Sequence, residues 1–283
     1  MLLGTLEQSF IFAIMVLGVY LSYKILDFPD MTVDGSFPLG GAVASAILIK
    51  GGNPISALVV ATICGAIAGL ITGMIHVKLK VTNLLAGIIV MTGLYSVNLR
   101  IMGKSNIPLF SVKHLFNGNV IPIVTLVILL ILAKITIDYL LKTKFGFALK
   151  ALGDNETLVI SLGIDEKKLK IYGLMIANSF VALSGAILAQ YQGFADVGMG
   201  TGTIITGLAS IIIGEAIFKK RSFISMSMTV ILGTIIYRTI IAMSLKLGMN
   251  ASDLKLITSI LVVGIIFLKE KKSLLGRGGK KYA

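Results

Sequence analysis

A few polar side chains stand inside long apolar stretches of this sequence, where they could bind a polar solute. Tyr95 and Asn98 are three residues apart and so share one face of a helix, from which the amide could hydrogen-bond a solute while the ring covers its apolar part. Asn178 and Gln190 lie in a later apolar stretch. Because polar groups are costly in lipid, we regard all four as candidates for a translocation path; hydrogen bonding between helices is the equally weighted alternative.

Asp34, Gly35 and Ser36 belong to a stretch rich in Pro, Gly and Asp, residues 27–41. Such a stretch cannot form an ordinary uninterrupted helix, so we expect the second membrane span to be broken or partly re-entrant. Irregular backbone at membrane depth is tolerated only where protein or a watery cavity satisfies its polar groups, which makes these three residues further path candidates. A cytoplasmic turn before a short helix is the alternative.

The sequence offers no recognisable set of residues for catalysis, metal binding or nucleotide binding. Cys64 is the single cysteine, and His76 and His114 have no carboxylate or thiol at ligand spacing. A Gly-x-x-x-x-Gly-Lys-Ser/Thr phosphate loop is missing from the sequence. We therefore expect no enzyme activity and no cofactor in this chain. Glu215 and Arg238, in neighbouring apolar stretches, have opposite charges and could simply neutralise one another.

The elements that position these residues must be membrane helices. The chain of 283 residues is 56% hydrophobic and only 14% charged, with a mean hydropathy of +0.95. A helix crosses about 30 Å of hydrocarbon with about 20 apolar residues. The sequence thus predicts an all-α polytopic transmembrane bundle of about 8–10 spans, forming one domain over residues 1–283. We expect these spans near residues 5–26, 36–49, 54–77, 84–99, 119–140, 171–192, 203–218, 222–243 and 254–268.

Glycines in these spans recur at one fixed offset, which indicates an inverted repeat. Gly65, Ala66, Ile67, Gly73 and Gly87 return 120 residues later as Gly185, Ala186, Ile187, Gly193 and Gly207. The spans concerned run in opposite directions in the predicted topology, as in inverted-topology repeats. Close helix packing is the default explanation for glycines four residues apart, as at positions 65, 69 and 73.

Residues 142–170 form a charged island between two apolar stretches. Its leucines and valine fit the apolar faces of two short helices, and Gly153 and Gly163 mark the turns after them. Asp154 or Asn155 could cap the second helix. We expect a rigid helix-turn-helix at the membrane surface, able to dock in a groove of a soluble partner.

The basic residues set the topology. If the island is cytoplasmic, eighteen Lys and Arg fall on that side and five on the other, which predicts an N-terminus outside and a C-terminus inside. The basic tail, residues 269–283, is expected to meet anionic lipid head groups rather than nucleic acid.

The island carries a family resemblance. Ala151-Leu152-Gly153-Asp154-Asn155-Glu156, followed by Ser161-Leu162-Gly163-Ile164, resembles the coupling loop of ABC-importer permeases of the ribose and branched-chain amino-acid type, apart from Asp154 where a second glycine is usual. Residues 32–42 resemble the glycine-rich motif of a subgroup associated with uptake of amino acids, including aromatic ones. By this resemblance, the coupling residues are Gly146, Leu149, Ala151, Gly153, Asp154, Asn155, Glu156 and Gly163.

The resemblance implies a permease subunit in the bacterial cytoplasmic membrane. Two copies would form the path, a separate ATPase with bound ATP and Mg would dock on residues 142–170, and an extracytoplasmic binding protein would deliver a small solute, by preference an amino acid. An ion-coupled secondary transporter with Asp34 in its path is the alternative. A membrane-embedded enzyme would need a clustered nucleophile, base or metal site.

Overall fold

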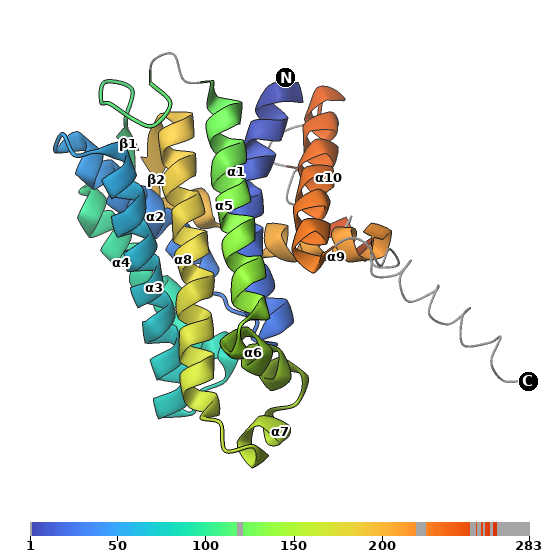
Figure 1. Ribbon diagram of the computed structural model, residues 1–283. Coiled ribbons are helices and arrows are strands. Elements are labelled where there is room, and N and C mark those ends of the chain that lie inside the picture. Colours follow the sequence, from blue (N-terminus) through green and yellow to red (C-terminus); the bar gives the residue numbers. More distant parts are fainter. Residues whose placement is uncertain are drawn as a thin grey trace, which may run out of the picture.

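The computed structural model describes residues 2–117, 121–218 and 225–249, together with 253, 256, 258–260 and 263–264. The described residues form an all-α bundle, as predicted (Figure 1). Its one small sheet pairs two antiparallel strands of three residues, β1 and β2, with Ile107 opposite Ala195. The elements in chain order are α1 (Leu2–Tyr20), a π-helical turn (Leu21–Ile25), α2 (Val33–Ile49), α3 (Pro54–Leu79), α4 (Asn83–Met102), β1 (Asn106–Pro108), α5 (Pro122–Lys142), α6 (Lys144–Asp154), α7 (Glu156–Ser161), α8 (Glu166–Gln192), β2 (Phe194–Asp196), a 3-10 turn (Val197–Gly200), α9 (Thr203–Phe218) and α10 (Met226–Lys246).

Local sequence signals explain where these helices begin and end. Asn53 caps α3 by accepting a hydrogen bond from the N-H of Ile55, and Pro54 occupies the first helical position, where its missing N-H costs nothing. Thr143 and Asp165 cap α6 and α8 in the same way. At the other end of α8, Gly193 adopts a left-handed conformation with φ of 75°, which terminates the helix.

Seven of the helices in the described residues are long and apolar enough to cross a membrane, and α2 is a shorter apolar helix. Large apolar side chains on the outer faces of α3, α4 and α5 are exposed, including Ile63, Ile89 and Ile131. Such surfaces suit lipid rather than water. The chain is therefore a multi-pass membrane protein. Most of the predicted last span, residues 254–268, and all of the tail, residues 269–283, lie outside the described residues.

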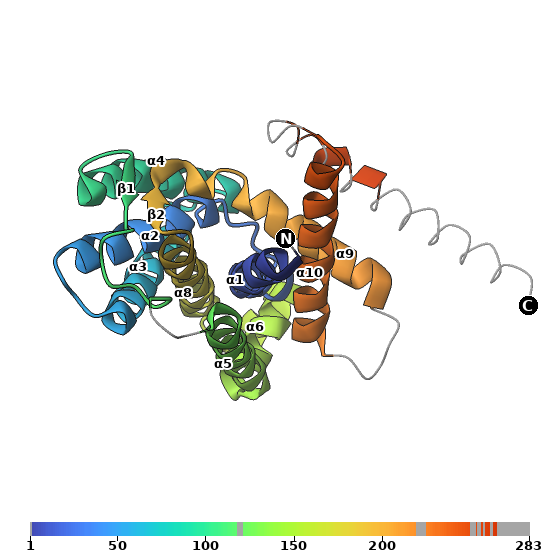
Figure 2. The ribbon, with the colours of Figure 1, turned by 90° about the horizontal axis from the view of Figure 1, so that it is seen from above.

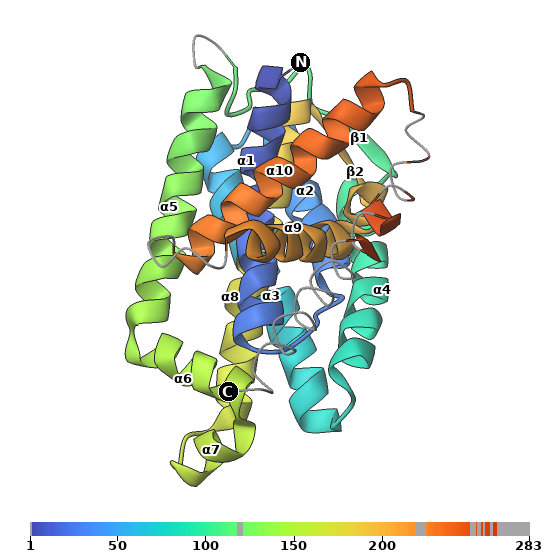
Figure 3. The same cartoon turned by 90° about the vertical axis from the view of Figure 1, so that its right-hand side faces the viewer.

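One span differs in direction from the prediction. The helix at 203–218 forms as expected, but α9 runs across the other helices instead of alongside them (Figures 1 and 3). The stretch that precedes it, residues 193–202, leads into the bundle and contains β2 and the 3-10 turn. Because α9 lies across the bundle, its N-terminal end sits among other helices, close to the start of α2.

The predicted break in the chain is present, but it lies before the second span and does not interrupt it. Helix α1 ends in a π-helical turn, residues 26–32 are not helical, and α2 begins at Val33. Phe28, Asp30 and Thr32 in this break are buried, so protein surrounds the irregular backbone. Contrary to expectation, Pro38 lies within α2 and does not interrupt it.

Helices α2, α3 and α8 form the tightest part of the bundle, beside α1 (Figure 2). Gly65 and Gly69 of α3 lie against the backbone of α8, where a Cβ atom would overlap the carbonyl oxygens of Asn178 and Leu174. Gly185 of α8 meets the carbonyl of Phe37 in the same manner. The glycines thus let α8 pack at close range against both α3 and α2, as the default explanation holds. Gly65 and Gly185 contact different helices, so their role in packing does not itself establish a repeat.

Candidate functional site

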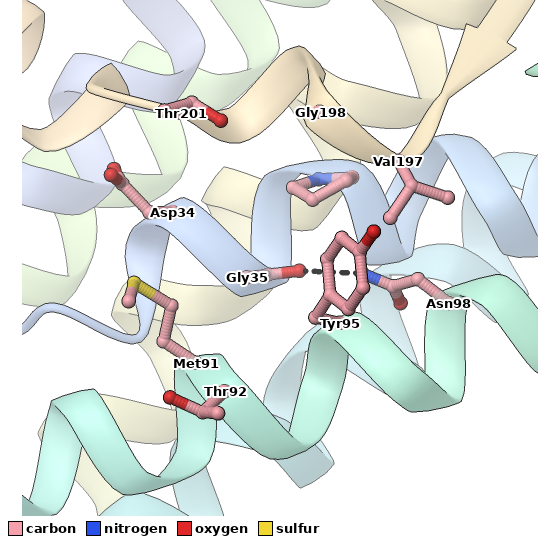
Figure 4. A pocket seen from close by; sticks show the side chains of 10 residues that line it. Asp34, Gly35, Met91, Thr92, Tyr95, Asn98, Val197, Gly198 and Thr201 are labelled. Carbon is pink, nitrogen blue, oxygen red and sulfur yellow. Dashed lines mark hydrogen bonds between the residues drawn. The ribbon is translucent and has the colours of Figure 1, made fainter. Parts of the chain in front are cut away.

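A pocket of about 310 Å³ lies between α2, α4 and the 3-10 turn (Figure 4). It brings together four of the predicted path residues, Asp34, Gly35, Tyr95 and Asn98. Tyr95 and Asn98 do share one face of α4, as their spacing predicted. The tyrosine ring is 57% exposed, whereas Asn98 is fully buried at the pocket wall.

Asn98 offers an unsatisfied acceptor at this pocket. Its amide nitrogen donates to the carbonyl of Gly35 at 3.1 Å. Its Oδ1 atom is buried, and the described residues provide no hydrogen-bond partner for it. A buried acceptor without a partner is costly, so this oxygen is well suited to accept a hydrogen bond from a solute or a water molecule.

Asp34 serves first as the cap of α9. Its Oδ1 atom accepts hydrogen bonds from the N-H of Ile204 at 2.8 Å and the hydroxyl of Thr203 at 2.9 Å, and its Oδ2 atom accepts from the N-H of Gly202 at 2.8 Å. The carboxylate therefore ties the start of α2 to the positive end of α9. Gly200 makes this approach possible, because a Cβ atom there would overlap the carbonyl oxygen of Asp34.

Three other predicted path residues lie away from the pocket. Asn178 donates to Asp30 Oδ2 at 2.7 Å and accepts from the hydroxyl of Ser36 at 2.7 Å, all in the buried interior. Gln190 accepts from the N-H of Leu115 at 2.9 Å and donates to the carbonyl of Pro54. For Asn178 and Gln190, the structure therefore shows the hydrogen bonding between segments that was their alternative role, and Ser36 takes part in the bonds of Asn178.

Asp30 is the member of this network that sequence reasoning missed. Its Oδ1 atom accepts from the N-H of Thr32 at 2.9 Å, two residues along the chain. An aspartate that accepts a hydrogen bond from the N-H two residues later forms a common local turn, and this local pattern is a sequence signal that could have identified Asp30. Its second partner, Asn178, is 148 residues away, and no local signal reveals that contact.

Glu215 and Arg238 do not neutralise one another. Glu215 pairs with Lys24 of the π-helical turn at 3.0 Å. Arg238 instead donates to Gln8 Oε1 at 2.6 Å and stacks over the ring of Phe12, 4.0 Å from its centroid. Direct neutralisation, one of the possibilities for this pair, is therefore not realised, because Lys24 at the end of α1 is the partner of Glu215.

The predicted coupling island consists of α6 and α7 at the end of the bundle opposite the N-terminus (Figure 1). Leu149, Leu152 and Val159 are buried and hold the two helices to the bundle. Gly146 and Gly153 allow close contact, since a Cβ atom would overlap the carbonyl oxygens of Leu140 and Ile25 respectively. The island is thus packed against the ends of α1 and α5 rather than free.

Polar residues fix the turn between these two helices. The side chain of Asn155 caps α7 by accepting from the N-H of Leu158, and its N-H donates to the carbonyl of Ala151. Glu156 pairs with Lys170 of α8 at 2.7 Å, and Gly163 has a φ of 73° that favours glycine. Asp154, the departure from the family pattern, is exposed at the end of α6. The outer face of α7 presents apolar side chains, Leu158 (50% exposed), Ile160 (52%) and Leu162 (65%).

The described residues contain no group of His, Cys, Asp and Glu that could hold a metal ion. The arrangement combines a pocket lined by Asp34, Tyr95 and Asn98 with exposed apolar side chains at the far end of the bundle.

Comparisons with known proteins agree with this arrangement. The chain is 51% identical over 265 residues to the tyrosine transport system permease protein of Clostridioides difficile, covering 94% of this chain and 90% of that one. It is 28% identical over 220 residues to the ribose import permease protein RbsC of Escherichia coli K12, covering 75% of this chain and 68% of that one. It is 27% identical over 225 residues to a probable branched-chain amino acid transport permease of Methanocaldococcus jannaschii, covering 71% of this chain and 69% of that one. No solved structure shows a significant match.

A family model described as branched-chain amino acid transport system / permease component matches residues 1–269. This match spans all of the described helices, including the pocket and the α6–α7 island. The chain therefore belongs to this family of permeases and is a permease component of an ABC-type import system.

Proposed function

We propose that this chain carries an amino acid across a bacterial cytoplasmic membrane, driven by a separate ATPase docked on α6 and α7 and supplied by an extracytoplasmic binding protein. The observation that carries the proposal is the α6–α7 island. It is a capped, glycine-packed unit fixed to α1 and α5, with exposed apolar side chains on its outer face. Such a unit can pass a displacement from a soluble partner into the bundle, which a loose loop could not.

The pocket supports a small solute with hydrogen-bond donors. Tyr95 supplies an aromatic surface, and Asn98 Oδ1 supplies a buried acceptor. The similarity to a protein named for tyrosine transport, at 51% identity against 28% for a ribose permease, favours an amino acid over a sugar. ATP and Mg belong to the partner in this proposal.

The pocket opens on a side of the molecule where a second copy would complete the path. Thr92, Ser96 and Arg100 are exposed along α4 at intervals of four residues, so that they form one polar stripe on a membrane helix. Polar stripes are disfavoured against lipid and suit contact with another protein or water. Figure 3 shows α4, α9 and α10 together on this side.

The ion-coupled alternative relied on Asp34. Its carboxylate accepts three hydrogen bonds from residues at the start of α9. These bonds explain the aspartate without a coupling ion, although they leave one lone pair of the carboxylate free. We therefore retain the ATP-driven importer.

Co-purification tests the proposal. The chain would be purified in mild detergent from its native membrane as wild type, as Leu162→Asp on the outer face of α7, and as Leu247→Asp, a matched control on an exposed leucine beyond the far end of α10. We expect an ATPase to accompany the wild type and the Leu247→Asp variant, with a loss of about tenfold or more for Leu162→Asp, because a charge is costly at an apolar contact. An ATPase that accompanies all three equally would argue against docking on α7.

Gly153 tests the coupling itself. In Gly153→Leu, the new side chain meets the carbonyl of Ile25 and must displace α6 from the end of α1. The variant should still insert and bind the ATPase, but uptake of radiolabelled tyrosine per ATP hydrolysed should fall strongly. Normal coupling in this variant would contradict the assigned role of the island.

A further inference from the structure

A second pocket, of about 440 Å³, adjoins the first and shares Asp34 and Thr201 with it. Its other walls come from α9, which contributes Thr206, and from α10, which contributes Tyr237 and Arg238. The two pockets therefore lie side by side, from α4 across the start of α9 to α10, with polar side chains at their common wall. Neither the family match nor any relative assigns a role to this second pocket.

Arg238 places a positive charge deep in the membrane-spanning part of this region. It lies twelve residues after Met226 and eight before Lys246, or about 18 Å and 12 Å along α10 at the usual helical rise. A guanidinium at that depth is costly unless it is paired or serves a function. Its position is well defined, since Gln8 accepts one of its hydrogen bonds and the Phe12 ring lies under it.

The guanidinium group of Arg238 has more hydrogen-bond donors than acceptors around it in the described residues. It carries five N-H donors, and within the described residues Gln8 supplies the one acceptor found for them. No ion pair joins Arg238 to a carboxylate of the described residues, although Asp34 lines the same pocket. Among the described residues that line this pocket, Arg238 and Asp34 carry opposite charges and form no ion pair with each other. A zwitterion of suitable length can satisfy both at once.

We propose that this pocket binds the head group of an α-amino acid, with Arg238 holding the carboxylate and Asp34 facing the ammonium group. The inference rests on the proposed function and names the part of the path that recognises the substrate class. The carboxylate of Asp34 keeps its three bonds to α9 and presents its remaining lone pair to the ammonium group. The neighbouring pocket, with Met91, Tyr95 and Asn98 in its walls, then receives the amino acid side chain. Because Asp34 and Thr201 line both pockets, the proposal places the ammonium group where the two pockets meet.

Binding measured on the permease alone tests this inference without the ATPase or the binding protein. The full chain would be placed in phosphatidylcholine nanodiscs, and weak binding of tyrosine, phenylalanine, tryptophan and leucine measured by saturation-transfer NMR. Binding of the amino acid with the highest affinity would then be compared with binding of its amide, which lacks the carboxylate, and of its deaminated acid, which lacks the ammonium group. Arg238→Gln, Arg238→Lys and Lys246→Gln would be compared with the wild type, Lys246 being an exposed cation at the end of α10.

We expect the wild type to bind the amino acid about tenfold or more tightly than either analogue. In Arg238→Gln, the affinity for the amino acid should fall to the affinity for its amide, and the affinity for the amide should not change. The affinity of Arg238→Lys for the amino acid should lie between those of Arg238→Gln and the wild type. Lys246→Gln should bind the amino acid as the wild type does. A merely structural Arg238 would lower binding of all three compounds together. Such a uniform loss would overturn the inference. Equal binding of the amino acid by Arg238→Gln and the wild type, or no binding by the wild type, would overturn it as well.

Anionic lipid is the other source of a negative group. In nanodiscs that contain phosphatidylglycerol, amino acid binding should persist. If this lipid abolishes amino acid binding by the wild type, the pocket binds a lipid head group, and the assignment of the pocket to an amino acid is wrong. Arg238-dependent binding without ATP-driven uptake in the co-purified complex would contradict the proposed function alone, whereas uptake with Arg238-independent binding would contradict this inference alone.

Discussion

Among single residues, Asn178 holds the break between α1 and α2 in place. Its amide joins Asp30 of the break to Ser36 of α2, and a neighbouring contact of 2.7 Å links the hydroxyls of Thr32 and Thr72. All of these groups are buried, so each has exchanged water for a protein partner. In such a setting the loss of one partner costs more than the average hydrogen bond, because the group left behind is unsatisfied.

We expect Asn178→Leu to lower the free energy of unfolding by about 3 kcal/mol, since it leaves the Asp30 carboxylate with fewer donors in the interior. Thermal unfolding in detergent, followed by a thiol-reactive dye at Cys64, measures this. Asn117→Leu, on an exposed loop residue, is the control and should melt like the wild type. Equal melting of both variants would show that the network does not hold the break.

Asp165 gives the start of α8 a dependence on pH. Hydrogen bonds from the backbone N-H and the side chain of Lys168 lower the pKa of this exposed carboxyl below its usual value of 3.8. A lowered pKa means that the ionised form stabilises the fold above the unfolded-state pKa, and that this contribution disappears as pH falls through the folded-state value. Hydrogen exchange at the N-H groups of Lys167 and Lys168 should therefore be slower in the wild type than in Asp165→Ala at pH 7, with the two converging below about pH 3. A difference that persists unchanged at low pH would contradict the charged cap.

At the scale of elements, glycine decides how closely the helices approach. Because lipid provides no hydrophobic force between helices, close van der Waals packing must hold α3 to α8. Gly69 lies against the carbonyl of Leu174, whereas Gly93 of α4 has open space where a Cβ atom would stand. The two residues therefore make a matched pair within membrane helices.

Gly69→Ala should destabilise the protein by about 2 kcal/mol or more, because the added methyl group forces α3 and α8 apart. Gly93→Ala should be neutral or slightly stabilising, since alanine favours helix over glycine. The same dye-based melting experiment distinguishes them. The packing argument fails if Gly93→Ala is the more harmful change.

At the scale of the whole molecule, the fold puts two different surfaces at its two ends. The N-terminus, β1 and β2 lie at one end, and α6 and α7 at the other (Figure 1). The distribution of Lys and Arg predicts that the α6–α7 end is cytoplasmic. Lys113, in the loop before α5, would then face outward.

Cysteine labelling tests this orientation. In a Cys64→Ala background, Lys113→Cys should react with a membrane-impermeant maleimide on intact cells, and Leu162→Cys should react only after the membrane is opened. Both positions are exposed, so access and not burial decides the result. The reverse labelling pattern would invert the topology and place the ATPase-docking surface on the wrong side.

Local composition was enough to predict several features. Hydropathy identified the membrane helices, the start of the Pro- and Gly-rich residues 27–41 coincides with the break, and residues 142–170 predicted two short helices with Asp154 or Asn155 as the cap of the second, a role that Asn155 fills. Each of these follows from residues a few positions apart, where propensity, capping and lipid solubility act.

Contacts between distant groups could be read only from the folded chain. Asp34 caps α9, Glu215 pairs with Lys24, Asn178 donates to Asp30, and Arg238 lines a pocket together with Asp34. These partners lie more than a hundred residues apart in sequence, and α9 lies across the bundle although its composition is that of an ordinary span. Composition fixes whether a segment prefers lipid, but the direction of a helix and the partner of a polar group depend on packing against elements far along the chain.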